Sequence, residues 1–170
     1  MDLATQRTAS SREDLERRLA ELAVPTSVVE HPAVFTVEDA KALRGDIPGG
    51  HCKNLFLKDK KDQIWLVVCL EEAAVDLKRL APRIGSARLS FGRPELLGQV
   101  LGVEPGSVTP FALINDVEQR ANVILDADMM RHELLNYQPL VNSATMTIRS
   151  TDLVKFIRAC GHEPKVVDLG

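Results

Sequence analysis

The sequence predicts a single α+β or mixed α/β domain, in which a mixed, largely antiparallel sheet is flanked by helices. Predicted strands and helices are interspersed along the chain, and several neighbouring strands are separated only by hairpin-like turns. The 170 residues contain no repeat and no linker, so residues 1–170 fit one domain, with flexible residues expected at 1–9. Hydrophobic residues make up 45% of the chain, which supports a core without disulfides or metal.

The N-terminal part predicts a helix, a strand and a second helix. Ser10 and Glu13 form a capping-box pattern, and three leucines at spacings of four and three follow it as one helical stripe. Pro25 ends this helix. The β-branched residues 26–29 predict a short strand, and residues 36–43 predict a short helix.

The middle of the chain predicts a hairpin followed by helices. Residues 52–58 and 63–70 read as its two strands, and the second is apolar on both faces, which is typical of a central strand. Residues 76–84 and 94–101 predict helices, with Gly102 as the C-cap of the latter.

The C-terminal part predicts alternating strands before and after one helix. Thr151 is the expected cap of that helix, and Gly161 closes it. Further strands are predicted at residues 89–91, 111–114, 122–125, 144–149 and 165–169.

Charge and composition exclude several classes of protein. The net charge is −3, from 24 acidic and 21 basic residues, which excludes a generally basic DNA-coating protein but allows a local basic site for a nucleic-acid end. No apolar run approaches the ~20 residues of a membrane span, and residues 1–14 lack the apolar core of a signal peptide. Three cysteines without paired spacing favour a reduced setting. We therefore expect a cytoplasmic protein that binds neither membrane nor DNA.

The patterns of common catalytic and metal centres are missing. No C-x-x-C or H-E-x-x-H spacing occurs, so the sequence predicts no metal site. There is no G-x-S-x-G elbow for a nucleophilic serine. Cys52 follows His51, but neighbours on a strand point to opposite faces. A covalent enzyme is therefore not supported.

The glycine-rich loop that ends at Lys53 allows two interpretations. It resembles a phosphate loop but lacks G-K-[ST], and Lys53 falls on a strand, so it is not an NTP site. It is either a plain entry to the hairpin with an ordinary surface lysine, or a space for a ligand. In the second case Lys53 presents a positive charge to phosphate, carboxylate or hydroxyl oxygens.

The loop from Gly106 to Pro110 also has a plain and a functional interpretation. It is either a turn between a helix and a strand or a nest of backbone donors. In the nest, Gly106 permits close approach and the N–H groups of Ser107, Val108 and Thr109 face one point. Such donors bind an oxyanion or polarise a carbonyl.

Five runs in order carry a resemblance to a known family: VEHPAVFTVE from Val29, GGHCKNLFLKD from Gly49, GSVTP from Gly106, PLVNSATMT from Pro139 and GHEP from Gly161. The chain resembles the aminoacyl-tRNA editing domain family of the YbaK/ProX type, from about residue 10 to residue 168. Within it, the chain looks like the freestanding prolyl-tRNA editing proteins, which deacylate alanine mischarged on proline tRNA.

The resemblance implies a mixed α/β domain with a substrate pocket beside the K-N strand. It also implies hydrolysis of the ester between an amino acid and the 3′ terminal ribose of tRNA, with no cofactor, metal or covalent intermediate. Lys53 matches the essential lysine of the family, and Asn54 matches the residue beside it. The loop from Gly106 matches the segment that holds the aminoacyl group. The implied partners are the acceptor end of tRNA(Pro) and, transiently, prolyl-tRNA synthetase.

One residue departs from the family pattern. Many relatives have His-Pro where this chain has Gln138-Pro139, and a glutamine cannot titrate. We therefore expect Gln138 to line the pocket rather than to act as a base. The expected catalytic residues are Lys53 and Gly106. The expected substrate-binding residues are His31, Val34, Phe35, Asn54, Ser107, Val108, Thr109, Pro110 and Gln138; Val34, Phe35, Leu55 and Val108 would be apolar walls, although each also suits an ordinary core.

The chemistry of the substrate is consistent with a site that has no acid–base pair. An aminoacyl ester is already activated, so a positioned water, a polarised carbonyl and an aligned ribose hydroxyl suffice. A proline pocket cannot strongly reject the smaller alanine, so a second sieve is needed. The hypothesis is hydrolysis of Ala-tRNA(Pro). The alternatives are a deacylase for another mischarged tRNA such as Cys-tRNA(Pro), and a non-catalytic module that binds tRNA or a synthetase.

Overall fold

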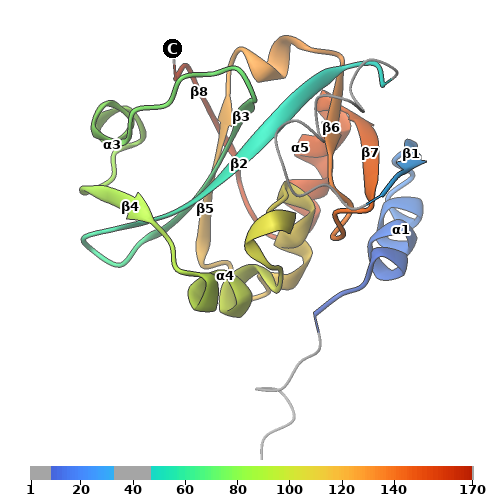
Figure 1. Cartoon of the computed structure of the whole chain (residues 1–170), viewed down its shortest axis with the longest axis horizontal. Helices are drawn as coiled ribbons and strands as arrows, with labels where there is room; N and C mark the ends of the chain where they lie inside the picture. Colours follow the sequence, from blue (N-terminus) through green and yellow to red (C-terminus); the bar gives the residue numbers. More distant parts are fainter. Residues whose placement is uncertain (1–8, 33–46, 170) are drawn as a thin grey trace, which may run out of the picture.

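The computed structural model describes residues 9–32 and 47–169, which form a mixed sheet with helices packed against it (Figure 1). The predicted helix at 36–43 and residues 1–8 lie outside the described residues. The helices are α1 (Arg12–Glu21), α3 (Leu77–Ile84), α4 (Pro94–Leu101) and α5 (Ser150–Ala159), with short 3₁₀ helices η2 (Pro105–Ser107), η3 (Pro110–Asn115) and η4 (Met129–Arg131). The strands are β1 (Thr26–Glu30), β2 (Gly50–Asp59), β3 (Ile64–Leu70), β4 (Leu89–Phe91), β5 (Ala121–Asp126), β6 (Leu134–Tyr137), β7 (Ala144–Arg149) and β8 (Lys165–Val167).

The sheet has two parts that meet at the long strand β2. Its strand order is β1-β7-β6-β2-β3-β5-β8, and β4 pairs with β2 beside this path. The β1–β7, β7–β6, β2–β3 and β2–β4 pairs are antiparallel, whereas β2–β6, β3–β5 and β5–β8 are parallel. Figure 1 shows β2 running across the molecule, with β4 beside one end and β6 beside the other. The prediction of a mixed α/β sheet domain is confirmed.

Two apolar clusters hold the sheet. The larger contains residues of α1, α4, η3 and α5, and the smaller contains Leu80 and Ile84 of α3. β3 contributes to both, because Leu66 belongs to the larger cluster and Val67 to the smaller, and neither is exposed to solvent. The prediction that this strand is central is therefore confirmed. Within the described residues no helix is long and apolar enough to span a membrane.

Several predicted element boundaries are wrong. Residues 111–114 form part of η3 and not a strand, because Pro110 and the Thr109 hydroxyl, which accepts from Phe111 N, start a tight turn. The first helix is capped one residue later than predicted, by Ser11 with Asp14. The last helix begins at Ser150, so Thr151 does not cap it.

One strand near the site was not predicted at all. β6 is only four residues long and follows the short helix η4, so it has too few residues to show a period. It supplies the parallel contact to β2, through Gly50 opposite Leu135 and His51 opposite Asn136. This contact joins the two parts of the sheet.

Candidate functional site

A pocket of about 280 Å³ lies where the two parts of the sheet meet, between β2, β6, β7 and the η2 loop. Its position follows from the topology: β2 pairs with β3 along most of its length but with β6 over only two residues. The pocket is lined by His31, Ile47, His51, Cys52, Lys53, Asn54, Glu71, Pro105, Gly106, Val108, Asn136, Tyr137, Gln138 and Thr145.

Lys53 is the pocket's cation, and its position is set by the β2–β3 hairpin. It lies opposite Cys69 in the antiparallel register and is half-buried. Its Nζ donates a hydrogen bond to the carbonyl of Ala73, just beyond the end of β3. One hydrogen bond uses one of the three donors of an ammonium group, so the charge remains available to a ligand in the pocket. The Lys53 side chain is thus positioned by a hydrogen bond to the Ala73 carbonyl and is half-buried, unlike that of an ordinary surface lysine.

Asn54 ties the strand to the second predicted loop. Its Nδ2 donates to the carbonyl of Val108 at 3.1 Å, which holds the loop against β2. The oxygen of the same amide, Asn54 Oδ1, is buried and has no hydrogen-bond partner among the described residues. The same is true of Gln138 Oε1. Two unpaired acceptors at one pocket are unusual, because an unmade buried hydrogen bond is costly.

The Gly106 loop is open on its pocket side. Gly106 is exposed, does not have a positive φ, and a Cβ placed there would meet no atom within 4 Å. Ser107 N–H donates to the carbonyl of Glu104 at 2.9 Å, closing the η2 turn, so it does not join a nest that faces the pocket. Thr109 and Pro110 are buried in the fold beneath the loop. The free space therefore lies over Gly106 and Val108.

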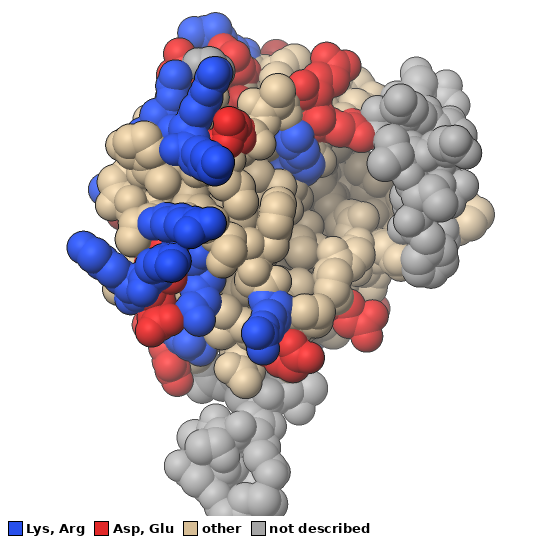
Figure 2. Space-filling view, turned by 60° about the vertical axis from the view of Figure 1, so that its left-hand side comes forward, with Lys and Arg blue, Asp and Glu red and all other residues tan. Residues whose placement is uncertain are grey.

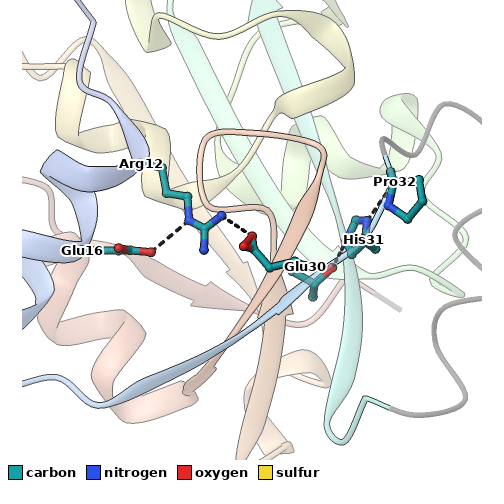
Figure 3. Close-up of polar contacts among 6 residues, drawn as sticks. Arg12, Glu16, Glu30, His31 and Pro32 are labelled. Atoms are coloured by element: carbon teal, nitrogen blue, oxygen red, sulfur yellow. Dashed lines mark hydrogen bonds and ion pairs between the residues drawn. The ribbon is translucent and has the colours of Figure 1, made fainter.

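His31 enters the pocket from the end of β1. Arg12 of α1 pairs with Glu16 at 2.9 Å and with Glu30 of β1, which fixes the strand against the helix (Figure 3). His31 Nδ1 lies 2.8 Å from the carbonyl of Pro32, and Nε2 lies 2.9 Å from Thr145 Oγ1. Since a carbonyl only accepts, a neutral His31 carries its proton on Nδ1 and accepts at Nε2 from the threonine.

Cys52 lines the pocket but is not a nucleophile. Burial raises the pKa of its thiol to about 12, so the thiol is protonated at neutral pH. The thiolate is the reactive form, and this site lacks it.

The carboxylates of Asp126, Asp128 and Asp168 lie within 4.8 Å of one another, outside the pocket. Among the described residues, these three carboxylates are the one group of potential ligand atoms that lie close enough together to hold a metal ion. None of the three lines the pocket.

The structure brings together six of the eleven predicted site residues. His31, Lys53, Asn54, Gly106, Val108 and Gln138 line one pocket, although they are up to 107 positions apart in sequence. Ser107, Thr109 and Pro110 support the loop without lining the pocket, and Val34 and Phe35 lie outside the described residues. Leu55 packs in the smaller core cluster.

Sequence reasoning missed several lining residues. His51 and Thr145 stand inside runs that carry the family resemblance, so the runs themselves held the signal. Asn136 had no such signal, because it lies on the unpredicted strand β6. Its Nδ2 donates to the carbonyls of Pro48 and Gly50, and its Oδ1 accepts from Thr147. It therefore fixes the junction beside the pocket.

The family of the chain follows from comparison with known proteins. The model of the aminoacyl-tRNA editing domain matches residues 31–156, and this range contains every residue that lines the pocket. The chain belongs to the aminoacyl-tRNA editing domain family. It is 39% identical to prolyl-tRNA synthetase associated domain-containing protein 1 of Bos taurus, with 94% of this chain and 96% of the relative covered.

One further relative supports this assignment, and a solved structure shares the fold. The chain is 33% identical to the prolyl-tRNA editing protein ProX of Acetoanaerobium sticklandii, over 89% of this chain and 93% of that protein. A solved structure described as a candidate trans-editing enzyme for prolyl-tRNA synthetase superposes with a TM-score of 0.71 at 19% identity, covering 96% of this chain and all of the other. The structural likeness shows the shared fold.

Proposed function

We propose that this chain is a cytoplasmic trans-editing deacylase that hydrolyses Ala-tRNA(Pro), in transient association with prolyl-tRNA synthetase. The observation that carries the proposal is the composition of the pocket. Lys53, the exposed Gly106 and the amide side chains of Asn54 and Gln138 line one space of about 280 Å³. The editing-domain family and the ProX relative support the same reaction class.

The pocket's groups match the parts of an aminoacyl ester. Asn54 and Gln138 supply polar side chains to the lining, which suit the polar α-ammonium and ester groups of an aminoacyl end. Lys53 is the group for the terminal adenosine or its phosphate. The ester carbonyl of the substrate lies over Gly106 and Val108, where the absence of a side chain on Gly106 leaves space.

Hydrolysis then needs only a positioned water. The water oxygen attacks the ester carbon, the bond between that carbon and the ribose oxygen breaks, and the ribose oxygen takes up a proton to become a hydroxyl. The amino acid leaves with a carboxylate, and one proton is released to solvent. The neighbouring ribose hydroxyl places the water, because alignment alone contributes a large share of such a rate.

We infer that the site admits a small amino acid and excludes proline by size. Exclusion of proline by size complements the synthetase, whose site cannot reject a smaller residue by more than ~1–3 kcal/mol. Cysteine is close to alanine in size, so it is the critical comparison.

The test is deacylation of Ala-tRNA(Pro), Cys-tRNA(Pro) and Pro-tRNA(Pro) by wild type and Lys53→Ala. We expect release of alanine, at least tenfold slower release of cysteine and no release of proline. Lys53→Ala is expected to lower kcat/KM for the alanyl substrate by 100-fold or more, equivalent to roughly 2.7 kcal/mol.

The matched control is Lys155→Ala. Lys155, like Lys53, donates its Nζ to a backbone carbonyl, that of Leu22, but it lies on α5 away from the pocket. It is expected to keep full activity. Folded wild type that hydrolyses none of the three substrates would overturn the deacylase and leave a binding module. Equal loss in both lysine variants would remove Lys53 from the site.

A further inference from the structure

The charges of this chain are distributed very unevenly. Residues 77–94 contain five Lys or Arg and no Asp or Glu, and the hairpin turn 58–62 contains three Lys and two Asp. These segments carry net charges of +5 and +1. Because the whole chain carries −3, the remaining residues carry −9. A mildly acidic protein therefore has one strongly basic region.

The fold brings the two basic segments together. β4 pairs with the end of β2 in the register Lys58 opposite Ser90, and Lys60 N–H donates to the carbonyl of Arg88 at 3.1 Å. Figure 2 shows Lys and Arg side chains gathered on the face of the molecule that carries α3, β4 and the hairpin turn. The patch is thus a product of the topology and not of one run of sequence.

A buried carboxylate makes this part of the molecule rigid. Asp59 is 3% exposed and accepts hydrogen bonds from the backbone N–H groups of Lys61, Gln63 and Ala87 and from Trp65 Nε1. These bonds fix the hairpin turn to the segment before β4. The backbone that carries the neighbouring cations is consequently held in place, unlike that of a loose hairpin tip.

An exposed aromatic ring lies among these cations. Phe91 is 65% exposed, more than any other large hydrophobic side chain of the described residues. It lines a groove of about 930 Å³ together with Lys58, Lys60 and Arg93, and Asp59, Asp62 and Glu95 line the same groove. Asp59 is buried and Asp62 pairs with Lys58 at 3.0 Å, so the groove's remaining charges are Lys60, Arg93 and Glu95. Two such cations beside an exposed ring suit a nucleic acid, because cations bind phosphates and an aromatic ring stacks on a base or sugar face.

We propose that Lys60, Lys61, Arg88, Phe91 and Arg93 form a basic face that binds the start of the tRNA acceptor stem while the 3′ end occupies the pocket. This inference rests on the proposed function and deepens it by naming the surface that binds the substrate's RNA.

The spacing along β2 supports this arrangement. Asn54 at the pocket and Lys58 at the groove are four residues apart on β2, roughly 13 Å at ~3.3 Å per residue. Phe56 between them is buried in the core, so the RNA passes over the surface that covers this part of the strand. A stacked strand covers that distance with about four nucleotides at ~3.4 Å each. This is the length of the unpaired 3′ end of a tRNA, so the first base pairs reach the basic face.

The test measures binding of uncharged tRNA(Pro), which needs no catalysis, by fluorescence anisotropy at about 0.1 M salt. The variant is Lys60→Glu with Lys61→Glu, since both side chains are exposed. Its control is Arg17→Glu with Lys155→Glu, which changes the net charge equally on exposed positions of α1 and α5. We expect at least tenfold weaker binding for the first variant and less than twofold for the control.

Two further readouts separate a specific RNA surface from general charge. The slope of log Kd against log salt is expected to fall by about 1 to 2 in the lysine variant, one phosphate for each lysine lost. Phe91→Ala is expected to weaken binding about fivefold or more with little change in that slope, because stacking is not ionic. In deacylation, both variants are expected to raise KM and to leave kcat unchanged.

The outcomes distinguish this inference from the proposed function. Equal tRNA affinity in wild type and in the variant with Lys60→Glu and Lys61→Glu overturns the basic face. The proposal is also overturned if wild type binds no tRNA. It is overturned as well if polyglutamate displaces bound tRNA as effectively as unlabelled tRNA does, which would point to an acidic or general polyanionic partner. Specific tRNA binding without deacylation overturns the enzyme but not the surface.

Discussion

At the scale of single residues, Gly106 is the most informative position in the site. It has no positive φ and no crowding, so neither the backbone nor the packing of the free protein requires glycine. A substrate carbonyl that lies against the loop does require it, because a methyl group would occupy the same space. We therefore propose that glycine at this position serves substrate binding rather than folding.

The prediction concerns Gly106→Ala, with Gly98→Ala as its control. Both positions have no atom within 4 Å of an added Cβ, and Gly98 lies on α4 away from the pocket. Gly106→Ala is expected to leave the melting temperature within about 2 °C but to lower kcat/KM at least tenfold. Gly98→Ala is expected to stabilise by roughly 0.8 kcal/mol through helix propensity and to keep activity. Unchanged activity in Gly106→Ala would contradict contact between substrate and loop.

The sequence predicted the residues of the site better than their contacts. Lys53, Asn54 and Gly106 were found because they stand in short contiguous runs. That Asn54 holds Val108, or that Lys53 holds Ala73, depends on distances between segments that no local pattern encodes. The same limit explains why a nest including Ser107 was expected although its N–H closes a 3₁₀ turn.

At the scale of elements, the short strand β6 determines whether the pocket exists. It pairs with β7 over four residues and with β2 over only two, so backbone pairing alone holds the junction weakly. The buried side chain of Asn136 supplements it with hydrogen bonds to two carbonyls and one hydroxyl. The side chain of Asn136 thus reinforces the backbone pairing that joins the two parts of the sheet.

Asn136→Ala is therefore expected to lower the free energy of unfolding more than the loss of a typical polar side chain does. It leaves the carbonyls of Pro48 and Gly50 and the Thr147 hydroxyl without their partner, at a cost of about 2–3 kcal/mol in the free energy of unfolding. Urea denaturation measures this cost. Asn122→Ala is the control, because Asn122 makes one hydrogen bond, to Ile64 O, and its side chain lies outside the pocket. It is expected to cost about 1 kcal/mol; equal costs would show that the junction does not depend on Asn136.

Elements with a clear period were predicted correctly, and elements fixed by tertiary contacts were not. β3 and the hairpin it forms with β2 were evident from a long apolar run. Residues 111–114 are equally apolar but form a 3₁₀ helix, because Phe111 packs edge-on against Tyr137 and Phe156 in the core. Four apolar residues fit either structure, and only the surrounding packing decides.

At the scale of the whole molecule, two buried carboxylates link turns to the sheet at separate places. Asp59 fixes the β2–β3 turn, and Asp116 fixes the turn before β5 through Arg120 N–H, Ala121 N–H and His162 Nε2 at 2.9 Å. Burial by itself raises the pKa of each carboxyl group, but the hydrogen bonds that each accepts outweigh it and lower the pKa below the ordinary value.

The sign of the pH effect follows from these lowered pKa values. A carboxyl group with a lower pKa in the folded than in the unfolded protein stabilises the fold above the unfolded value of about 3.9, and this contribution is lost as the pH falls through the folded value. We expect the free energy of unfolding to be flat near neutral pH and to fall below about pH 4. Asp116→Asn is expected to cost about 1–3 kcal/mol at pH 7 and to reduce the decline in acid.

Val123→Ala is the control for this prediction, because it removes buried apolar volume next to the same turn and introduces no titrating group. It is expected to lower the free energy of unfolding by a similar amount at every pH, so its curve lies parallel to that of wild type. The curves are measured by urea denaturation between pH 2.5 and 7. If the Asp116→Asn curve also runs parallel to wild type, the acid sensitivity of the molecule has another origin. If the Asp116→Asn curve instead converges on that of wild type as the pH falls, the ionised Asp116 carboxylate is one of the groups that stabilise the fold above pH 4.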